Sequence, residues 1–169
     1  MQLAKDNDYW DLDLSNVDRV IRCENRAMDS YHNILYSITA FFHEFHTWPR
    51  SIVIVGHGFK KPRIVDGHCN AIDFPLSRVA YVGIDPPAMT VANAENPGMQ
   101  GVVEALGDWK EDPHGRGEKL AAKRRQRNVH NVWQGVFVAE ASDKGGLLTE
   151  GAGDDEHLLD GAPRPWTRV

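Results

Sequence analysis

The 169-residue chain has little of what marks several large protein classes. It has only two cysteines, Cys23 and Cys69, too few for a disulfide-dense secreted scaffold or a zinc ribbon with four thiolates. No stretch approaches the ~18 uninterrupted apolar residues of a membrane span, and the amino-terminal residues lack the basic and apolar regions of a signal peptide. The sequence therefore predicts a cytoplasmic protein in a reducing compartment, with no membrane association.

Positive charge is also in short supply. Nineteen Lys and Arg against 24 Asp and Glu give a net charge of −5, so the chain lacks the global positive field on which non-specific nucleic-acid binding depends. The one dense basic run, from Lys119 to Arg127, is typical of a solvated helix face. A nucleic-acid partner is not expected, and RNA contact through this run is the weakest function considered.

The chain is long enough for one hydrophobic core and too short for two comfortable domains, with 41% hydrophobic residues. We expect an acidic lead-in segment over residues 1–17 and an α/β domain over residues 18–140. Residues 141–169 are rich in Gly, Asp and Pro and are expected to form a flexible or wrapping tail.

Hydrophobic periodicity predicts strands that alternate with helices. The β-branched run Ser51–Gly56 is typical of a strand buried on both faces of a parallel sheet. Helical spacing of apolar residues from Met28 to Phe45 predicts a long helix with Asn25 as its cap. This βαβ order is that of an α/β layer fold. The remaining predicted elements are strands over Asp18–Cys23 and Arg78–Ile84 and helices over Lys61–Phe74 and Glu118–Arg127.

Polar side chains follow the first two predicted strands. In open parallel sheets, ligands bind where the strands end and helices begin, and helix amino termini favour anions. We therefore expect an anionic ligand near these residues: Glu24, Asp29, Ser30 and Asn33 after the first strand, and His57, Lys60 and Arg63 after the second.

The same residues also have ordinary structural interpretations. Asp, Ser and Asn at a helix start commonly cap the helix, and Lys60 and Arg63 suit a solvated helix face. His57 lies between two glycines, where it is placed for acid–base work or is simply a solvated loop histidine. His43 and His46 lack the four-residue spacing of the zincin motif, so no metal site is predicted.

Three strings carry a family resemblance: ENRAMDSYHNILYSI, PRSIVIVGHGFKKPRIVDGHCNAIDFP and RVAYVGIDPP. Over about residues 19–128 they resemble the carboxy-terminal half of the YdcF/SanA/ElyC-like domain family, closest to its eukaryotic branch. Glu24, Ser30 and Asn33 match the family's acidic residue, Ser or Thr, and Asn at a long helix. A later motif with an aromatic residue, His, Pro and Arg is matched by Phe59, Lys60, Pro62 and Arg63, and Lys60 departs from the usual His.

The resemblance implies a Rossmann-like three-layer α/β sandwich, with a short, mainly parallel sheet flanked by helices. It also implies a nucleotide-like ligand such as S-adenosylmethionine. The family's amino-terminal half, with its first strand and Gly-rich loop, has no counterpart in residues 1–17. We expect a truncated product, strands supplied by another subunit, or a half-domain reworked to another end.

Two functional hypotheses follow. In the first, the domain binds an anionic or nucleotide-like small molecule, and any reaction is hydrolysis or group transfer on a phosphate-bearing substrate, with Glu24 or His57 as the general base. Ligand binding is then assigned to Asp29, Ser30, Asn33, Lys60 and Arg63. In the second, the chain is a non-catalytic interaction domain that completes its sheet by homodimerisation or by docking on a partner protein.

Overall fold

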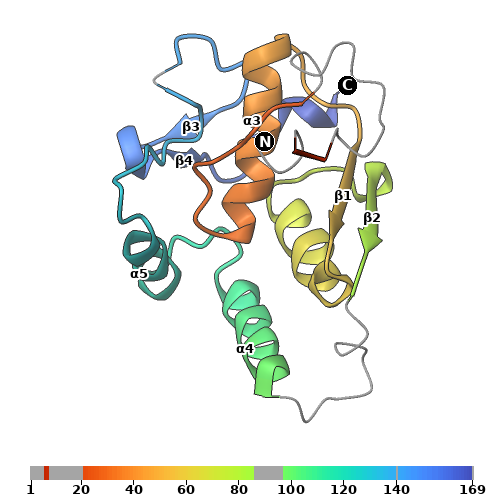
Figure 1. Ribbon diagram of the computed structural model, residues 1–169. Helices are drawn as coiled ribbons and strands as arrows, with labels where there is room; N and C mark the ends of the chain where they lie inside the picture. The colour runs from red at the N-terminus through yellow and green to blue at the C-terminus, as the bar shows by residue number, and fades with distance from the viewer. Residues whose placement is uncertain (1–5, 8–20, 86–96, 140, 169) are drawn as a thin grey trace.

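The computed structural model describes residues 6–7, 21–85, 97–139 and 141–168, and these form a mixed α/β fold arranged around one long helix (Figure 1). A two-stranded parallel sheet lies on one side of this helix and a small antiparallel pair on the other. The helices are α3 (Ser30–Phe45), α4 (Pro97–Glu111) and α5 (Glu118–Arg127), and the strands are β1 (Ile52–Gly56), β2 (Val79–Gly83), β3 (Thr149–Glu150) and β4 (His157–Leu158).

Helix α3 is the long helix predicted from the apolar spacing, but its cap is different. Asp29 has an extended backbone, and its side chain accepts a hydrogen bond of 2.8 Å from the backbone N–H of His32. The prediction of Asn25 as the cap is therefore wrong, because a capping side chain must reach the second or third N–H of the helix. The helix ends where His46 adopts a left-handed conformation (φ 53°).

The sheet confirms two of the three predicted strands. β1 and β2 pair in parallel from Ile52 and Val79 onward, as a βαβ unit requires. The third strand, predicted over Asp18–Cys23, is not formed in its described part: residues 21–23 are irregular, and residues 18–20 lie outside the described residues. Arg22 instead forms an ion pair with Glu44 of α3, which ties this segment to the helix.

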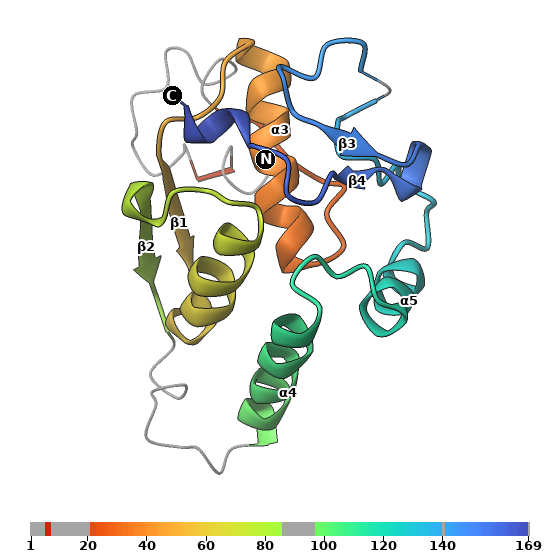
Figure 2. The same ribbon diagram turned by 180° about the vertical axis from the view of Figure 1, so that it is seen from behind.

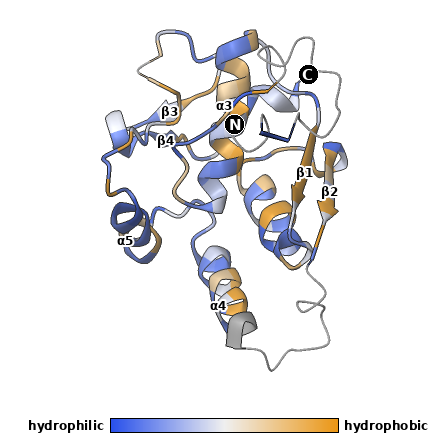
Figure 3. Cartoon of the chain, viewed as in Figure 1, coloured by the Kyte–Doolittle hydropathy of each residue, from blue (hydrophilic) through white to orange (hydrophobic). Residues whose placement is uncertain are grey.

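One face of the sheet is bare, contrary to the prediction that β1 is buried on both faces. Ile52, Ile54 and Val79 pack against the core, whereas Val53 and Val55 on the opposite face are 68% and 66% exposed. Both strands are strongly hydrophobic (Figure 3). An apolar face of the sheet is thus left in solvent. Within the described residues β1 pairs with β2 alone, so its other edge carries no strand there.

The helix predicted between β1 and β2 is present, but most of it is a π-helix. Residues Pro62–Cys69 form a π-helix, and the chain leaves the helical conformation before Asp73, which is left-handed (φ 55°). Viewed from behind, this helix lies between the sheet and α4 (Figure 2). Because it also packs against α3, it joins the sheet to the rest of the core.

The carboxy-terminal segment contributes to the core. Trp166 is completely buried, and its indole N–H donates to the carbonyl oxygen of Ile72 at 3.1 Å. Leu147 and Leu158 are also buried in the same hydrophobic cluster. α5 has the bounds predicted for the basic helix. None of the helices in the described ranges is long and apolar enough to cross a membrane.

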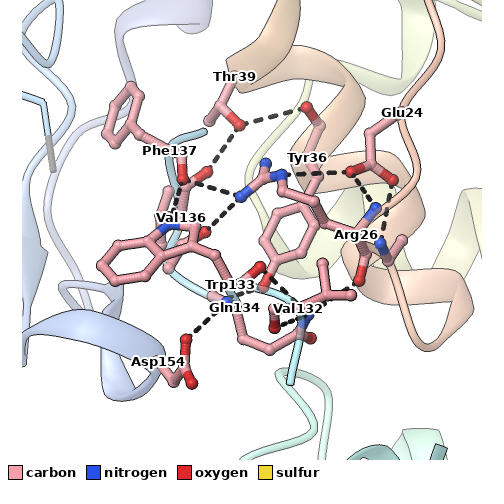
Figure 4. Close-up of polar contacts among 12 residues, drawn as sticks. Glu24, Arg26, Tyr36, Thr39, Val132, Trp133, Gln134, Val136, Phe137 and Asp154 are labelled. Carbon is pink, nitrogen blue, oxygen red and sulfur yellow. Dashed lines mark hydrogen bonds and ion pairs between the residues drawn. The ribbon is translucent and has the colours of Figure 1, made fainter. Parts of the chain in front are cut away.

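A buried arginine joins the segment before α3 to the segment after α5 (Figure 4). The Arg26 guanidinium donates to the carbonyl oxygens of Gly135 and Phe137 at 2.9 and 2.8 Å and lies 4.2 Å from the centre of the Tyr36 ring. Its charge is balanced by Glu24, 3.4 Å away. A charge removed from water needs such partners, so these contacts hold both segments on α3.

Replacing this arginine tests how much the junction stabilises the fold. We expect Arg26→Met to lower the free energy of unfolding by about 3 kcal/mol or more, because it leaves the Glu24 carboxylate buried without its partner. The matched control is Arg125→Met, which breaks an ion pair whose side chains are 63% and 83% exposed and should cost under about 1 kcal/mol. Urea unfolding of both variants measures the difference, and equal losses would contradict this account of Arg26.

Candidate functional site

A groove of about 550 Å³ runs between α3 and β1. The helix and the strand run in opposite directions, so the amino end of α3 lies beside the carboxyl end of β1 (Figure 1). The groove is polar at that end and mostly apolar elsewhere, where Ile34, Ile38 and Phe41 line it together with Ser37 and Ser51. This is the position at which the strand-end rule places a ligand.

The polar end brings together five of the seven residues predicted from the sequence. They are Ser30 and Asn33 from α3, His57 from the loop after β1, and Lys60 and Arg63 at the start of the helical stretch that follows. Among the described residues, no aspartate or glutamate lines the groove. Two cations and several hydrogen-bonding groups without a carboxylate form a lining that suits an anion.

The two cations have not been neutralised by the protein. Among the described residues, neither Lys60 nor Arg63 has a carboxylate within ion-pair distance, and the Lys60 ammonium lies 5.7 Å from the Phe59 ring centre. The Nε of Arg63 is buried and donates to no described acceptor. Partial burial lowers the pKa of Arg63, but a guanidinium keeps its charge at physiological pH.

His57 is held by the ends of both strands. Its Nδ1 lies 3.2 Å from the carbonyl oxygen of Ile84 and 3.8 Å from the carboxylate of Asp85. Asp85 also accepts the backbone N–H of Gly58 at 2.8 Å. Because the carbonyl oxygen can only accept, Nδ1 carries the proton in the neutral ring and Nε2 is left as the acceptor.

Glu24 and Asp29 are the two predicted site residues that do not line the groove. The Glu24 carboxylate accepts the backbone N–H groups of Arg26 and Ala27 at 2.8 and 3.1 Å. Asp29 caps α3 through one oxygen and lies 3.1 Å from the Arg124 guanidinium through the other. Both carboxylates are thus engaged in holding the chain around the start of α3.

One residue beside the site was missed from the sequence. His68 lies on the π-helix, and its Nε2 is 2.8 Å from the Ser30 hydroxyl oxygen. The ring is 1% exposed, and burial lowers its pKa to about 3, so it is neutral at physiological pH. The sequence places His68 beside Cys69. Only the folded chain brings Ser30 within hydrogen-bond distance of the His68 ring.

A second cavity, of about 480 Å³, lies between α3, α5 and the carboxy-terminal segment. Its three arginines already have acidic partners: Arg116 pairs with Asp160, Arg124 with Asp29, and Arg125 with Glu118. In the part of the chain that the structure describes, no group of three metal-ligating side chains is assembled. The groove beside β1 is therefore the better candidate site.

The chain is homologous to the uncharacterised protein YOR238W of Saccharomyces cerevisiae. The two are 32% identical over 160 residues, which cover 86% of this chain and 52% of the yeast protein. The chain thus spans about half the length of this relative. No family model matches the sequence. No solved structure matches it either.

Two histidines that are largely removed from solvent, His68 beside the groove and His32 beside the second cavity, predict a loss of stability in mild acid. Burial lowers the pKa of His32 to about 4 and that of His68 to about 3, against 6.5 for an exposed ring. Below pH 6.5 the unfolded chain therefore binds protons that the folded chain cannot. The free energy of unfolding decreases as the pH is lowered. By pH 5 each ring should cost about 2 kcal/mol relative to pH 7.

Urea unfolding at pH 7, 6 and 5 measures this effect. His68→Gln and His32→Gln should each flatten the pH dependence, whereas Gln126→Ala, at an exposed position without a titratable group, should leave the wild-type slope unchanged. A wild-type slope in both buried variants would contradict the assignment of neutral buried rings.

Proposed function

We propose that this protein binds an anionic, phosphate-bearing small molecule at the polar end of the groove. The observation that carries the proposal is a pair of cations, Lys60 and Arg63, that have no carboxylate partner within the described part of the chain and line the same groove. Arg63 supplies a planar fork that suits two oxygens of one phosphate, and Lys60 supplies a point charge. Ser30 and Asn33 add hydrogen-bonding groups.

The lining favours a phosphate over S-adenosylmethionine. That ligand carries a sulfonium, and the described lining of the groove offers it two cations and no carboxylate. The resemblance to the YdcF/SanA/ElyC-like family, with its Rossmann-like fold, supports a nucleotide-like body attached to the anionic group. Ile34 and Phe41 offer apolar surface for such a body.

A reaction on the bound phosphate would use His57 as the general base. Its neutral Nε2 can accept a proton from water or from a substrate hydroxyl, while Lys60 and Arg63 stabilise the charge that develops on the phosphoryl oxygens. Glu24 is less suited to this role, because its carboxylate already accepts two backbone N–H groups. Hydrolysis or group transfer is the class of reaction that this proposal names.

Ligand-induced stabilisation tests the binding proposal. The purified chain is melted with inorganic phosphate, pyrophosphate, ATP or S-adenosylmethionine, and a ligand at a hundred times its Kd should stabilise it by about 2.7 kcal/mol. We expect a phosphate compound to raise the Tm of the wild type and Arg63→Ala or Lys60→Ala to weaken its binding about tenfold or more, because a charged hydrogen bond is lost.

The adjacent Lys61 provides the matched control. Its side chain is exposed and does not line the groove, so Lys61→Ala should bind the same ligand as tightly as the wild type. If Lys60→Ala and Lys61→Ala behave alike, general surface charge is responsible and the proposed site is rejected.

The bare sheet face supports a second candidate function, that of an interaction domain. Val53, Val55 and Val82 are exposed on the same side of the sheet, and an apolar face and an open strand edge commonly mark an interface. In this alternative two copies of the chain cover the face and complete the sheet. The groove residues would then have no ligand to hold.

Solution mass separates the two candidate functions. If the alternative is correct, light scattering should report a dimer for the wild type and a monomer for Val55→Lys, because a lysine cannot be buried without a partner. The control is Val129→Lys, since Val129 is 73% exposed and does not belong to the sheet. A monomeric wild type would remove the homodimer from consideration.

A further inference from the structure

The π-helix aligns two side chains that an ordinary helix would separate. Its hydrogen bonds join residue i to residue i+5. Two residues that are five apart therefore lie about one turn from each other, on the same side of the helix. In an α-helix with 3.6 residues per turn, five residues span about 1.4 turns and their side chains point apart. Arg63 and His68 are five residues apart within Pro62–Cys69. One lines the groove and the other contacts Ser30 at its wall.

His68 has only one polar partner among the described residues. Its Nε2 lies 2.8 Å from the Ser30 hydroxyl oxygen, whereas its Nδ1 is buried without a hydrogen bond. The rings of Tyr31 and Trp109 meet it edge to face, with centroids 5.9 and 4.5 Å away. A neutral ring in this apolar surrounding has a single N–H, which is on either Nε2 or Nδ1.

The two tautomers direct the Ser30 proton differently. With the proton on Nδ1, a buried N–H has no acceptor and the serine must donate its own proton to Nε2. With the proton on Nε2, the ring donates a hydrogen bond to the serine oxygen. The serine hydroxyl can then donate its own proton to a group in the groove. The second arrangement leaves no buried N–H without an acceptor, because the partly exposed serine hydroxyl can donate to solvent or to a ligand in the groove, so it is the favoured one.

We propose that His68 is a positioning residue of the groove, which donates from Nε2 to Ser30 and thereby turns the serine hydroxyl proton towards the ligand beside Arg63. This inference rests on the proposed anion site and deepens it. Arg63, Lys60 and Ser30 then all act as donors, so the bound group is an oxyanion whose oxygens are free to accept. Ser30 serves as a binding group, because a ring that already holds its proton on Nε2 cannot withdraw the serine proton.

The tautomer can be observed directly, without a ligand. Long-range ¹H–¹⁵N correlation spectra of the folded wild type distinguish a protonated from a bare imidazole nitrogen, and His68→Gln assigns the signals. We expect a protonated Nε2 and a bare Nδ1. A protonated Nδ1 would overturn the proposal, because Ser30 would then donate to the ring and not to the groove.

Phosphate affinity tests the consequence of this arrangement. In titrations with inorganic phosphate, Ser30→Ala should weaken binding about tenfold, since a hydrogen bond to a charged oxygen is lost. His68→Met removes the donor with little change of volume and should weaken binding by a similar factor. The double variant should bind no more weakly than either single variant, and His68→Gln, which keeps an N–H donor, should restore most of the affinity.

Failure of this inference differs from failure of the proposed function. If the wild type binds phosphate and His68→Met binds it as tightly, the positioning role is wrong and the anion site stands. If the wild type binds no phosphate compound, the anion site is wrong, and with it the role given to His68, whichever tautomer the spectra report.

Discussion

The buried guanidinium of Arg26 is the interaction on which much of the described fold depends. It joins the segment before α3 to the carbonyl groups of Gly135 and Phe137, and the ring of Tyr36 lies beneath it. Tyr36 also donates its hydroxyl to the carbonyl oxygen of Gln134. A charge in this position is tolerated only while its partners remain, so the segment after α5 is held on α3 by electrostatics as well as by packing.

The two cavities also differ in how their cationic side chains are paired. Around the cavity beside α5, the arginines are satisfied by carboxylates from other parts of the chain, as Arg116 is by Asp160. In the groove beside β1, Lys60 and Arg63 have no such partner among the described residues. Both cations lie close to the part-buried contact between Ser30 and His68. The proposed anionic ligand would supply the negative charge that they lack among the described residues.

The bare sheet face imposes a different constraint. A βαβ unit with two strands has a core on one side only, and here Val53 and Val55 meet solvent on the other. The small-molecule function needs only the carboxyl end of β1, whereas the interaction function needs this whole face. The two proposed functions therefore depend on different parts of β1.

Local patterns in the sequence predicted much of the fold. The β-branched run of β1, the apolar spacing of α3 and the basic stretch of α5 each depend on residues near one another in the chain, so their types and approximate bounds were correct. The strand expected over residues 18–23 was wrong in its described part because strand formation needs a neighbour, which periodicity does not supply. The π-helical winding of Pro62–Cys69 was not predicted either, since the apolar spacing of a short stretch does not distinguish a π-helix from an α-helix.

For the candidate site too, the sequence predicted some features and the tertiary structure decided the others. By itself the sequence predicted that polar and basic residues follow β1 and begin α3. Five of the seven residues that it grouped line the groove, although the strand expected before α3 is not formed in its described part. Only the tertiary structure decided that Glu24 and Asp29 are engaged elsewhere and that His68 contacts Ser30. The reason is physical: a residue's type and its distance along the chain are local properties, whereas its hydrogen-bond partner is chosen by segments that meet only after folding.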